Sequence, residues 1–344
     1  MVKTRNYSFD LMKFFCVVAV ICIHLEPFIN SYLGSIINAL CRVAVPLFFM
    51  CSGYLFLSKF SKDYSKKYFY KMLNYFITWN VLYTLMFIFI NFFSEGGINK
   101  SINYIFNNYK IVNIYYGVGM IQFHLWYLTA MVLIIPALYI VNKYNLINKT
   151  LIISGLLNIS SIFIYNSGYL NNNRDAIFFA LFYCTLGMYL KSKEEIIRKK
   201  LKNKINNIYL IYILLFTITS LIERLLYDLV FIRTGDFYVS TIPLSILIFL
   251  LCVVKVKKVD NIFCKIGRQS FGIYVIHVAI IKIIYMFLYK FDMHEFTLTT
   301  IWQIIGTPIV MFLSLISYEV LILISNKFLA LIRNKKINRE YIID

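Results

Sequence analysis

The sequence predicts an all-α membrane protein, a polytopic helix bundle of about ten transmembrane helices with both termini in the cytoplasm. Three observations predict it. Of 344 residues, 60% are hydrophobic and only 15% are charged, which is more apolar surface than a soluble domain of this length can bury. The apolar residues gather in runs of about 20, the length that crosses a bilayer. The charged residues lie mostly between these runs.

The apolar runs follow one another along the whole chain. They cover residues 9–29, 36–57, 73–93, 124–142, 149–166, 175–191, 206–224, 237–255, 270–289 and 301–326. The longest piece between runs, 94–123, is expected to hold a short re-entrant or interfacial segment. No stretch has the composition of a separate soluble domain, so residues 1–344 are predicted to form a single transmembrane domain.

The cations alternate from one connecting segment to the next. Of the 35 Lys and Arg residues, 26 lie in the two terminal segments and in every second connection, and only six lie in the others. Because cytoplasmic loops carry the excess of Lys and Arg, this alternation places both termini in the cytoplasm. The net charge of +19 is therefore interpreted as a topology signal, and a nucleic-acid partner is rejected.

The sequence contains no signature of a metal or nucleotide site. The seven cysteines are odd in number, lack CxxC spacing and lie mostly within the runs, so we interpret them as unpaired apolar residues and predict no bound metal. A P-loop, GxSxG, HExxH or GxGxxG motif is absent. This argues against ATP-driven, serine-hydrolase, metalloprotease and dinucleotide-dependent chemistry.

The first run carries the strongest candidates, Lys13 and His24. Eleven residues are about three helical turns, so the two side chains share a face and lie about 16 Å apart along the axis. His24 has the chemistry of a general base, and its alternative is a histidine that only packs between helices. Lys13 is either a binding cation or the neutralising partner of Asp10.

The second run begins with Arg42 and continues through Pro46 to Ser52-Gly53. Pro46 and Gly53 predict a kinked helix with a close-packing point. A guanidinium at this depth needs an anion or several carbonyls, so Arg42 is a candidate for oxyanion stabilisation or acceptor binding.

Two further candidates lie at predicted external ends of runs. His124 and Trp126 begin the fourth run, where an aromatic residue is either an interfacial anchor or part of a sugar-binding surface. Arg174 precedes the sixth run beside Asp175. This pair is either a loop salt bridge or a substrate contact.

The ninth run opens from the cytoplasmic side with Gly267-Arg268-Gln-Ser270, and Tyr274 and His277 follow at helical spacing. A helix start beside an arginine suits an anion, which makes Arg268 a candidate for donor binding. Tyr274 and His277 are candidates for substrate contact.

Five of these stretches together resemble the acyltransferase 3 family of bacterial inner-membrane proteins. They are residues 10–24, 42–56, 123–128, 186–190 and 267–277. The resemblance runs nearly end to end, and it is greatest with short members such as the O-acetyltransferases of enterobacterial common antigen. The first motif of the family commonly has Arg where this chain has Lys13. A lysine keeps the charge but loses the bidentate fork.

The resemblance implies an O-acyltransferase of the bacterial inner membrane with no permanently bound cofactor. It implies acetyl-CoA or another acyl-CoA as the cytoplasmic donor, with Lys13 and Arg268 at the CoA, and His24 as general base or acyl carrier. The implied acceptor is a glycan or lipid-linked glycan, contacted by Arg42, His124, Trp126, Arg174, Tyr274 and His277. Membrane lipid and polysaccharide-assembly proteins are the other expected partners.

Two other functions fit the residues. Ten spans with intramembrane charges are also typical of a secondary transporter of a small solute or glycan, although no inverted repeat is visible. A structural subunit of a polysaccharide-assembly complex is the third reading, and such a subunit would not need His24.

Overall fold

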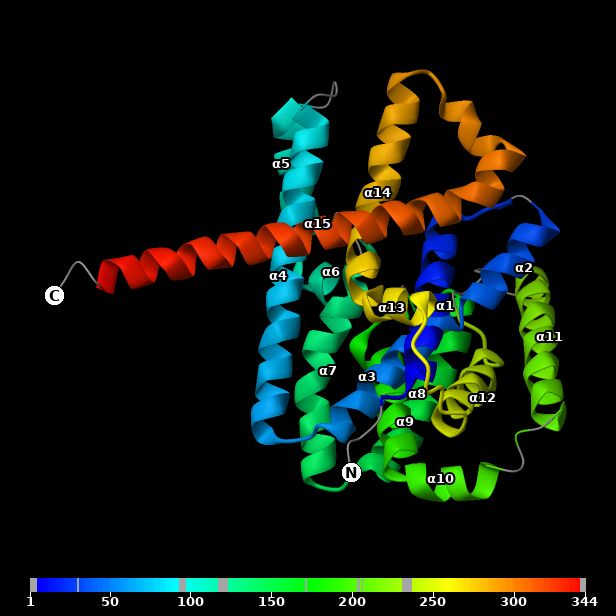
Figure 1. Ribbon diagram of the computed structural model, residues 1–344. Coiled ribbons are helices and arrows are strands. Elements are labelled where there is room, and N and C mark those ends of the chain that lie inside the picture. Colours follow the sequence, from blue (N-terminus) through cyan, green and yellow to red (C-terminus); the bar gives the residue numbers. More distant parts are fainter. Residues whose placement is uncertain are drawn as a thin grey trace.

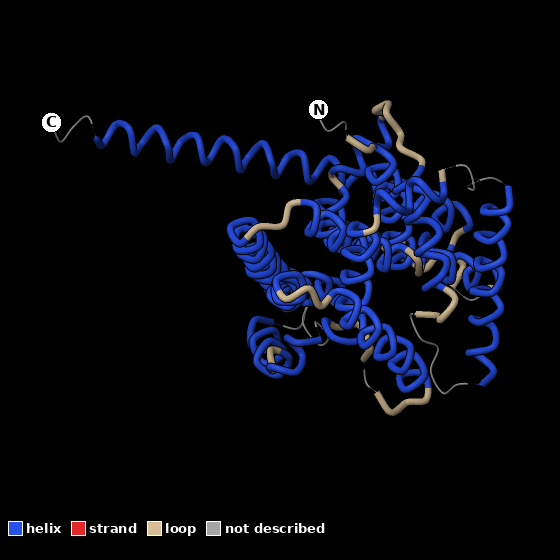
Figure 2. Tube along the Cα trace, turned by 90° about the horizontal axis from the view of Figure 1, so that it is seen from below, coloured by secondary structure: helices blue, strands red, loops and turns tan. Residues whose placement is uncertain are grey.

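Helices account for every regular element in the computed structural model, which describes residues 5–29, 31–92, 97–116, 123–170, 172–202, 205, 207–230 and 237–340 (Figures 1 and 2). In chain order they are α1 (Tyr7–Leu25), α2 (Tyr32–Cys41), α3 (Ala44–Ser58), α4 (Lys62–Phe92), α5 (Gly97–Asn108), α6 (Ile111–Tyr116), η1 (Phe123–Leu125), α7 (Trp126–Lys143), α8 (Ile147–Asn166), η2 (Ala176–Ala180), α9 (Leu181–Ser192), α10 (Glu194–Leu201), α11 (Asn207–Val230), α12 (Thr241–Val254), α13 (Ile262–Arg268), α14 (Ser270–Lys290), η3 (His294–Leu298) and α15 (Thr300–Glu340).

The predicted fold class is confirmed. Among the described residues, eight helical segments are long and apolar enough to cross a membrane, and two shorter apolar helices, Ala176–Ser192 and Thr241–Val254, lie where the sixth and eighth runs were predicted. The helices exceed the apolar runs at some ends. For example, α4 begins at Lys62, because a helix continues through charged turns that a hydropathy criterion excludes. The 94–123 segment contributes α5 and α6, and residues 93–96 and 117–122 lie outside the described ranges.

The second predicted run is broken into two helices. The break lies at Arg42 and Val43, which form a turn between α2 and α3. Pro46 is the third residue of α3, where its missing N–H removes no intrahelical hydrogen bond. The chain therefore bends before the proline, and Arg42 lies in the bend and not within a continuous helix.

Glycines allow α3 and α9 to pack with their backbones in contact. A Cβ on Gly53 would lie 1.9 Å from the Cys184 carbonyl oxygen, and one on Gly187 would lie 2.0 Å from the Met50 carbonyl oxygen. Such reciprocal small residues are a common basis of helix packing in membranes. The close-packing point predicted at Gly53 is confirmed.

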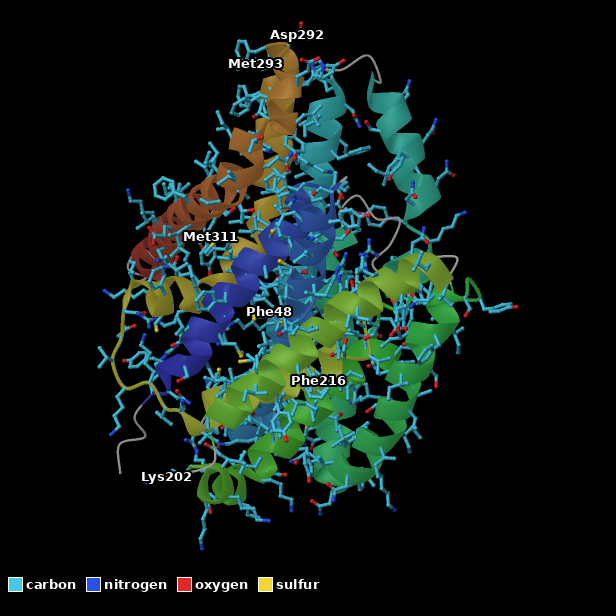
Figure 3. All side chains as sticks on the ribbon, turned by 90° about the vertical axis from the view of Figure 1, so that its right-hand side faces the viewer. Phe48, Lys202, Phe216, Asp292, Met293 and Met311 are labelled. Atoms are coloured by element: carbon cyan, nitrogen blue, oxygen red, sulfur yellow. The ribbon has the colours of Figure 1, made fainter. Side chains whose placement is uncertain are left out.

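The bundle has a buried interior and an apolar periphery. The largest of its fully buried side chains are aromatic, such as Phe49, Phe179 and Tyr183. Peripheral helices such as α11 instead expose leucines and isoleucines, as lipid-facing helices do. Loops predicted on opposite sides of the membrane lie at opposite ends of the bundle: Lys202 is at one end, and Asp292 and Met293 are at the other (Figure 3).

Candidate active site

One cavity is lined by residues from both ends of α1. Its volume is about 380 Å³, within the usual range for a small-ligand site. Side chains from α1, α3, α4, α7, α13, α14 and α15 line it. Six of the nine candidate residues are among them: Lys13, His24, His124, Trp126, Arg268 and Tyr274. Phe48, which also lines the cavity, lies near the middle of the bundle (Figure 3).

Four cations line this cavity. Two are the predicted Lys13 and Arg268, and two, Lys59 and Lys71, are additions from the structure. Lys59 follows α3, and Lys71 lies on α4 above the ring of Tyr75, 5.6 Å from its centroid. Both belong to the cation-rich connections, a charge signal that could have identified them. Together the four cations suit a ligand that carries several negative charges.

Cations surround the Asp10 carboxylate, but it does not bind Lys13 closely. Its carboxylate accepts two hydrogen bonds from Arg5, at 2.7 and 2.9 Å. The Lys13 Nζ lies 3.9 Å from it, and so does the nearest guanidinium nitrogen of Arg268. Arg268 itself makes a bidentate pair with Asp260, at 2.9 and 3.0 Å. Because Arg5 satisfies the Asp10 carboxylate, Lys13 is not confined to neutralising it.

Gly267 sets the position of Arg268. A Cβ at Gly267 would lie 1.8 Å from the Asp10 carbonyl oxygen, so α13 touches the backbone of α1 at the level of Asp10. The next residue, Arg268, is thereby brought beside the start of α1. The glycine that precedes the arginine in the sequence motif thus has a packing reason.

Three of the four histidines of the chain cluster at the other end of the cavity, and two of them, His24 and His124, line it. They come from α1, η1 and α14. The ring centroids of His24 and His277 are 5.0 Å apart, those of His124 and His277 are 5.3 Å apart, and those of His24 and His124 are 6.1 Å apart. His124 and His277 are buried, whereas His24 is partly exposed to the cavity. His24 is therefore the histidine placed to meet a ligand.

The two ring nitrogens of His277 differ in their hydrogen bonding. Its Nδ1 lies 2.6 Å from the Tyr274 carbonyl oxygen, which requires Nδ1 to carry the proton and makes Nε2 an acceptor in the neutral ring. The buried Nε2 of His277 and both ring nitrogens of His124 have no hydrogen-bond partner among the described residues. Buried nitrogens of this kind are costly, and so they call for a functional reason.

Aromatic residues fix the wall between the two ends. The Tyr274 hydroxyl donates to the His124 carbonyl, and the Tyr127 hydroxyl lies 2.8 Å from the Ser52 hydroxyl. Trp126 packs against Phe49, with ring centroids 5.6 Å apart. An aromatic wall beside polar hydroxyls suits both a hydrocarbon arm and a sugar ring.

The three remaining candidates do not line this cavity. His277 lies behind His24. Arg42 lines a second pocket, described below, and Arg174 lies in the loop before η2, where Asp175 caps η2 by accepting a hydrogen bond from the Phe178 N–H. Arg42 and Arg174 still lie within electrostatic reach of His24. Burial and the nearby charge of Arg42 lower the pKa of Arg174 to about 10.

A helix bundle with a cationic cavity end and a histidine cluster at its other end has the features of a polytopic membrane enzyme. The sequence profile of the acyltransferase domain family, acyltransferase 3, matches residues 6–319. The chain belongs to this family of acyltransferase domains, and its long apolar helices make it a multi-pass membrane domain.

Two curated relatives are amino-acid racemases from Enterococcus faecalis. One is 31% identical over 141 residues, which are 38% of this chain and 19% of the racemase, and the other is 30% identical over 251 residues, 65% of this chain and 33% of the racemase. The matched region thus spans a third or less of these relatives. No solved structure matches the chain.

Proposed function

We propose that this protein is an O-acetyltransferase of the bacterial inner membrane. It moves an acetyl group from cytoplasmic acetyl-CoA to a hydroxyl of a cell-surface polysaccharide or its lipid-linked precursor. The observation that carries the proposal is the single cavity that connects Lys13 to His24. The family membership does not identify the donor or the acceptor, but it favours an acyltransferase over a transporter. The racemase matches cover too little of those proteins to support a racemase.

The cationic end is where the donor would bind. CoA carries a diphosphate and a ribose phosphate, and the four cations Lys13, Lys59, Lys71 and Arg268 line one cavity. The Lys13–His24 spacing of about 16 Å along α1 is of the order of an extended pantetheine arm. The thioester would then lie at the histidine cluster while the phosphates remain at the cationic end.

At the histidine cluster, His24 acts as the general base. Its ring accepts the proton of the acceptor hydroxyl as that oxygen attacks the thioester carbonyl, the C–S bond breaks, and the proton passes to the departing thiolate. In the alternative route, a ring nitrogen of His24 attacks the thioester carbonyl, the C–S bond breaks and CoA leaves as the thiolate. The acceptor hydroxyl then attacks the acetyl-histidine, the C–N bond breaks, and the hydroxyl proton passes to the thiolate. In both routes His277 Nε2 would accept the other N–H of His24 and hold the ring in place.

Inverted membrane vesicles containing the protein provide the test. Radiolabelled acetyl-CoA is added outside, and the glycan fraction is isolated and treated with mild base, which releases O-acetyl esters. We expect base-labile label in glycan from inverted vesicles and none from right-side-out vesicles, because the cationic end and both termini are proposed to face the cytoplasm. Label that stays in CoA, or appears only as free acetate, would contradict the proposal.

A further inference from the structure

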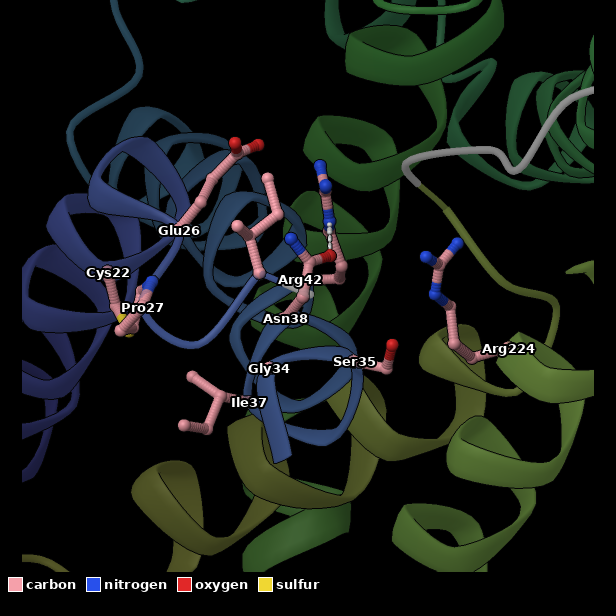
Figure 4. Close-up of a pocket in the computed structure, with 10 residues that line it drawn as sticks. Cys22, Glu26, Pro27, Gly34, Ser35, Ile37, Asn38, Arg42 and Arg224 are labelled. Atoms are coloured by element: carbon pink, nitrogen blue, oxygen red, sulfur yellow. Dashed lines mark hydrogen bonds between the residues drawn. The ribbon is translucent and has the colours of Figure 1, made fainter. Parts of the chain in front are cut away.

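A second, smaller pocket lies at the C-terminal end of α1 (Figure 4). Cys22 in the last turn of the helix and Glu26, which follows it, line this pocket. Its volume is about 210 Å³, smaller than the usual range for a whole ligand. The pocket therefore has room for one substituent of a larger molecule.

Arginines dominate the charge of this pocket. Arg42 reaches it from the break between α2 and α3, and Arg224 reaches it from α11, whereas Glu26 is the one acidic side chain among the described lining residues. In Figure 4 the charged groups of these three residues extend to the same side. The Arg42 Nε donates to the Asn38 Oδ1 at 2.8 Å, which fixes the plane of the guanidinium. Fixed guanidinium planes suit oxyanions such as carboxylate and phosphate.

Charges of both signs lie next to this pocket. Glu223, next to Arg224 in sequence, uses its carboxylate to accept hydrogen bonds from the N–H groups of Val239 and Ser240, at 2.6 and 2.9 Å. It thus holds the start of α12. Arg174 adds a third cation within electrostatic reach of Arg42.

We infer that the pocket lined by Arg42 and Arg224 seats an oxyanion, a carboxylate or a phosphate, carried by the acceptor. The inference rests on the proposed function and narrows its acceptor to an anionic glycan. Arg42 is within electrostatic reach of His24. An anionic group held at Arg42 therefore brings a hydroxyl of the same or an adjoining sugar towards the base.

Thermal unfolding of the whole protein in phosphatidylcholine nanodiscs tests this. The ligands are methyl glucuronide, methyl glucoside 6-phosphate and neutral methyl glucoside, which differ at one substituent. We expect at least one anionic glycoside to raise the unfolding temperature more than the neutral one, because a ligand stabilises the state that binds it. Arg224→Gln should weaken the apparent affinity for that glycoside about tenfold or more and leave methyl glucoside unaffected. Which anion stabilises more identifies the oxyanion.

Lys290→Gln is the matched control, because it removes one exposed cation from the end of α14 and should keep the preference of the wild type.

Acetyl-CoA added in the same assay reports on the other cavity. Stabilisation of Arg224→Gln by acetyl-CoA, as in the wild type, shows that the variant is folded. The inference is overturned if no glycoside discriminates by charge in the wild type, or if Arg224→Gln retains the discrimination. Failure of acetyl-CoA to stabilise the wild type would instead count against the proposed function.

Discussion

The polar groups at the two ends of α1 differ in whether they have hydrogen-bond partners. At the Asp10 end, the carboxylate accepts two hydrogen bonds from Arg5 and has Lys13 and Arg268 within 3.9 Å. At the His24 end, the neighbouring rings of His124 and His277 bury three nitrogens that have no partner among the described residues. An unsatisfied buried polar group costs about 1–3 kcal/mol. We propose that the Asp10 end is a frame that binds and that the His24 end is kept for chemistry.

The largest effect is expected from a substitution at the His24 end of α1. His277→Leu removes the Nε2 acceptor behind His24 and should lower kcat for acetyl transfer about 100-fold, within the range for general-base catalysis, with the KM for acetyl-CoA unchanged. His277→Gln keeps an acceptor oxygen and should recover part of the rate. Steady-state kinetics in proteoliposomes measure both variants. Equal losses in the two, or a raised KM, would assign His277 a structural role instead.

The next largest effect is a loss of stability expected from a substitution at the Asp10 end of α1. Asp10→Asn removes the buried carboxylate that Arg5 binds with two hydrogen bonds and should lower the free energy of unfolding by about 1–3 kcal/mol. The rate per folded molecule should stay the same, because Asp10 does not line the cavity. Thermal unfolding and kcat, measured on the same sample, separate the two quantities. A lost rate with unchanged stability would contradict the comparison.

A smaller effect, on the KM for acetyl-CoA, is expected from substitutions of Lys13. Lys13→Gln should raise the KM for acetyl-CoA about fivefold at unchanged kcat, since one partly exposed charge contributes about 1 kcal/mol. Lys13→Arg should keep the KM close to that of the wild type. Lys67→Gln, which removes an exposed cation that does not line the cavity, is the control. If Lys67→Gln raises the KM as much as Lys13→Gln does, the effect is general electrostatics.

The smallest effect lies outside both ends, at Glu194. Burial alone would raise the pKa of this carboxyl, but hydrogen bonds from Lys191, Tyr54 and Arg198 lower it to about 2, below its ordinary 4.5. Its stabilisation is therefore complete above the ordinary value and lost as the pH falls towards 2. Glu194→Gln should cost up to about 1 kcal/mol at neutral pH, with no change in transfer. Unfolding temperatures between pH 7 and pH 3 should converge for the two proteins, and a constant gap would contradict this.

Hydropathy and loop charge were sufficient to predict the helices and much of the cavity. Lys13 and His24 share a face of one helix, so their relation follows from helix geometry alone. The approach of His124 and His277 to His24 could not be predicted, because it depends on how η1 and α14 pack against α1. The placement of Arg42 was missed for a local reason, the break at Arg42 and Val43. Lys59 and Lys71 were visible as loop charges, but their reach into the cavity was not.

The most direct measurement compares His24→Ala with Lys13→Gln in one proteoliposome preparation, by the Kd for acetyl-CoA and the single-turnover rate of transfer to a glycolipid extract. We predict that His24→Ala binds acetyl-CoA as the wild type does and transfers about 10²- to 10⁴-fold more slowly. Lys13→Gln should instead bind more weakly and transfer at the wild-type rate once saturated. Retained transfer in His24→Ala, or a loss of donor binding equal to that of Lys13→Gln, would contradict the division of α1 into a binding end and a reacting end.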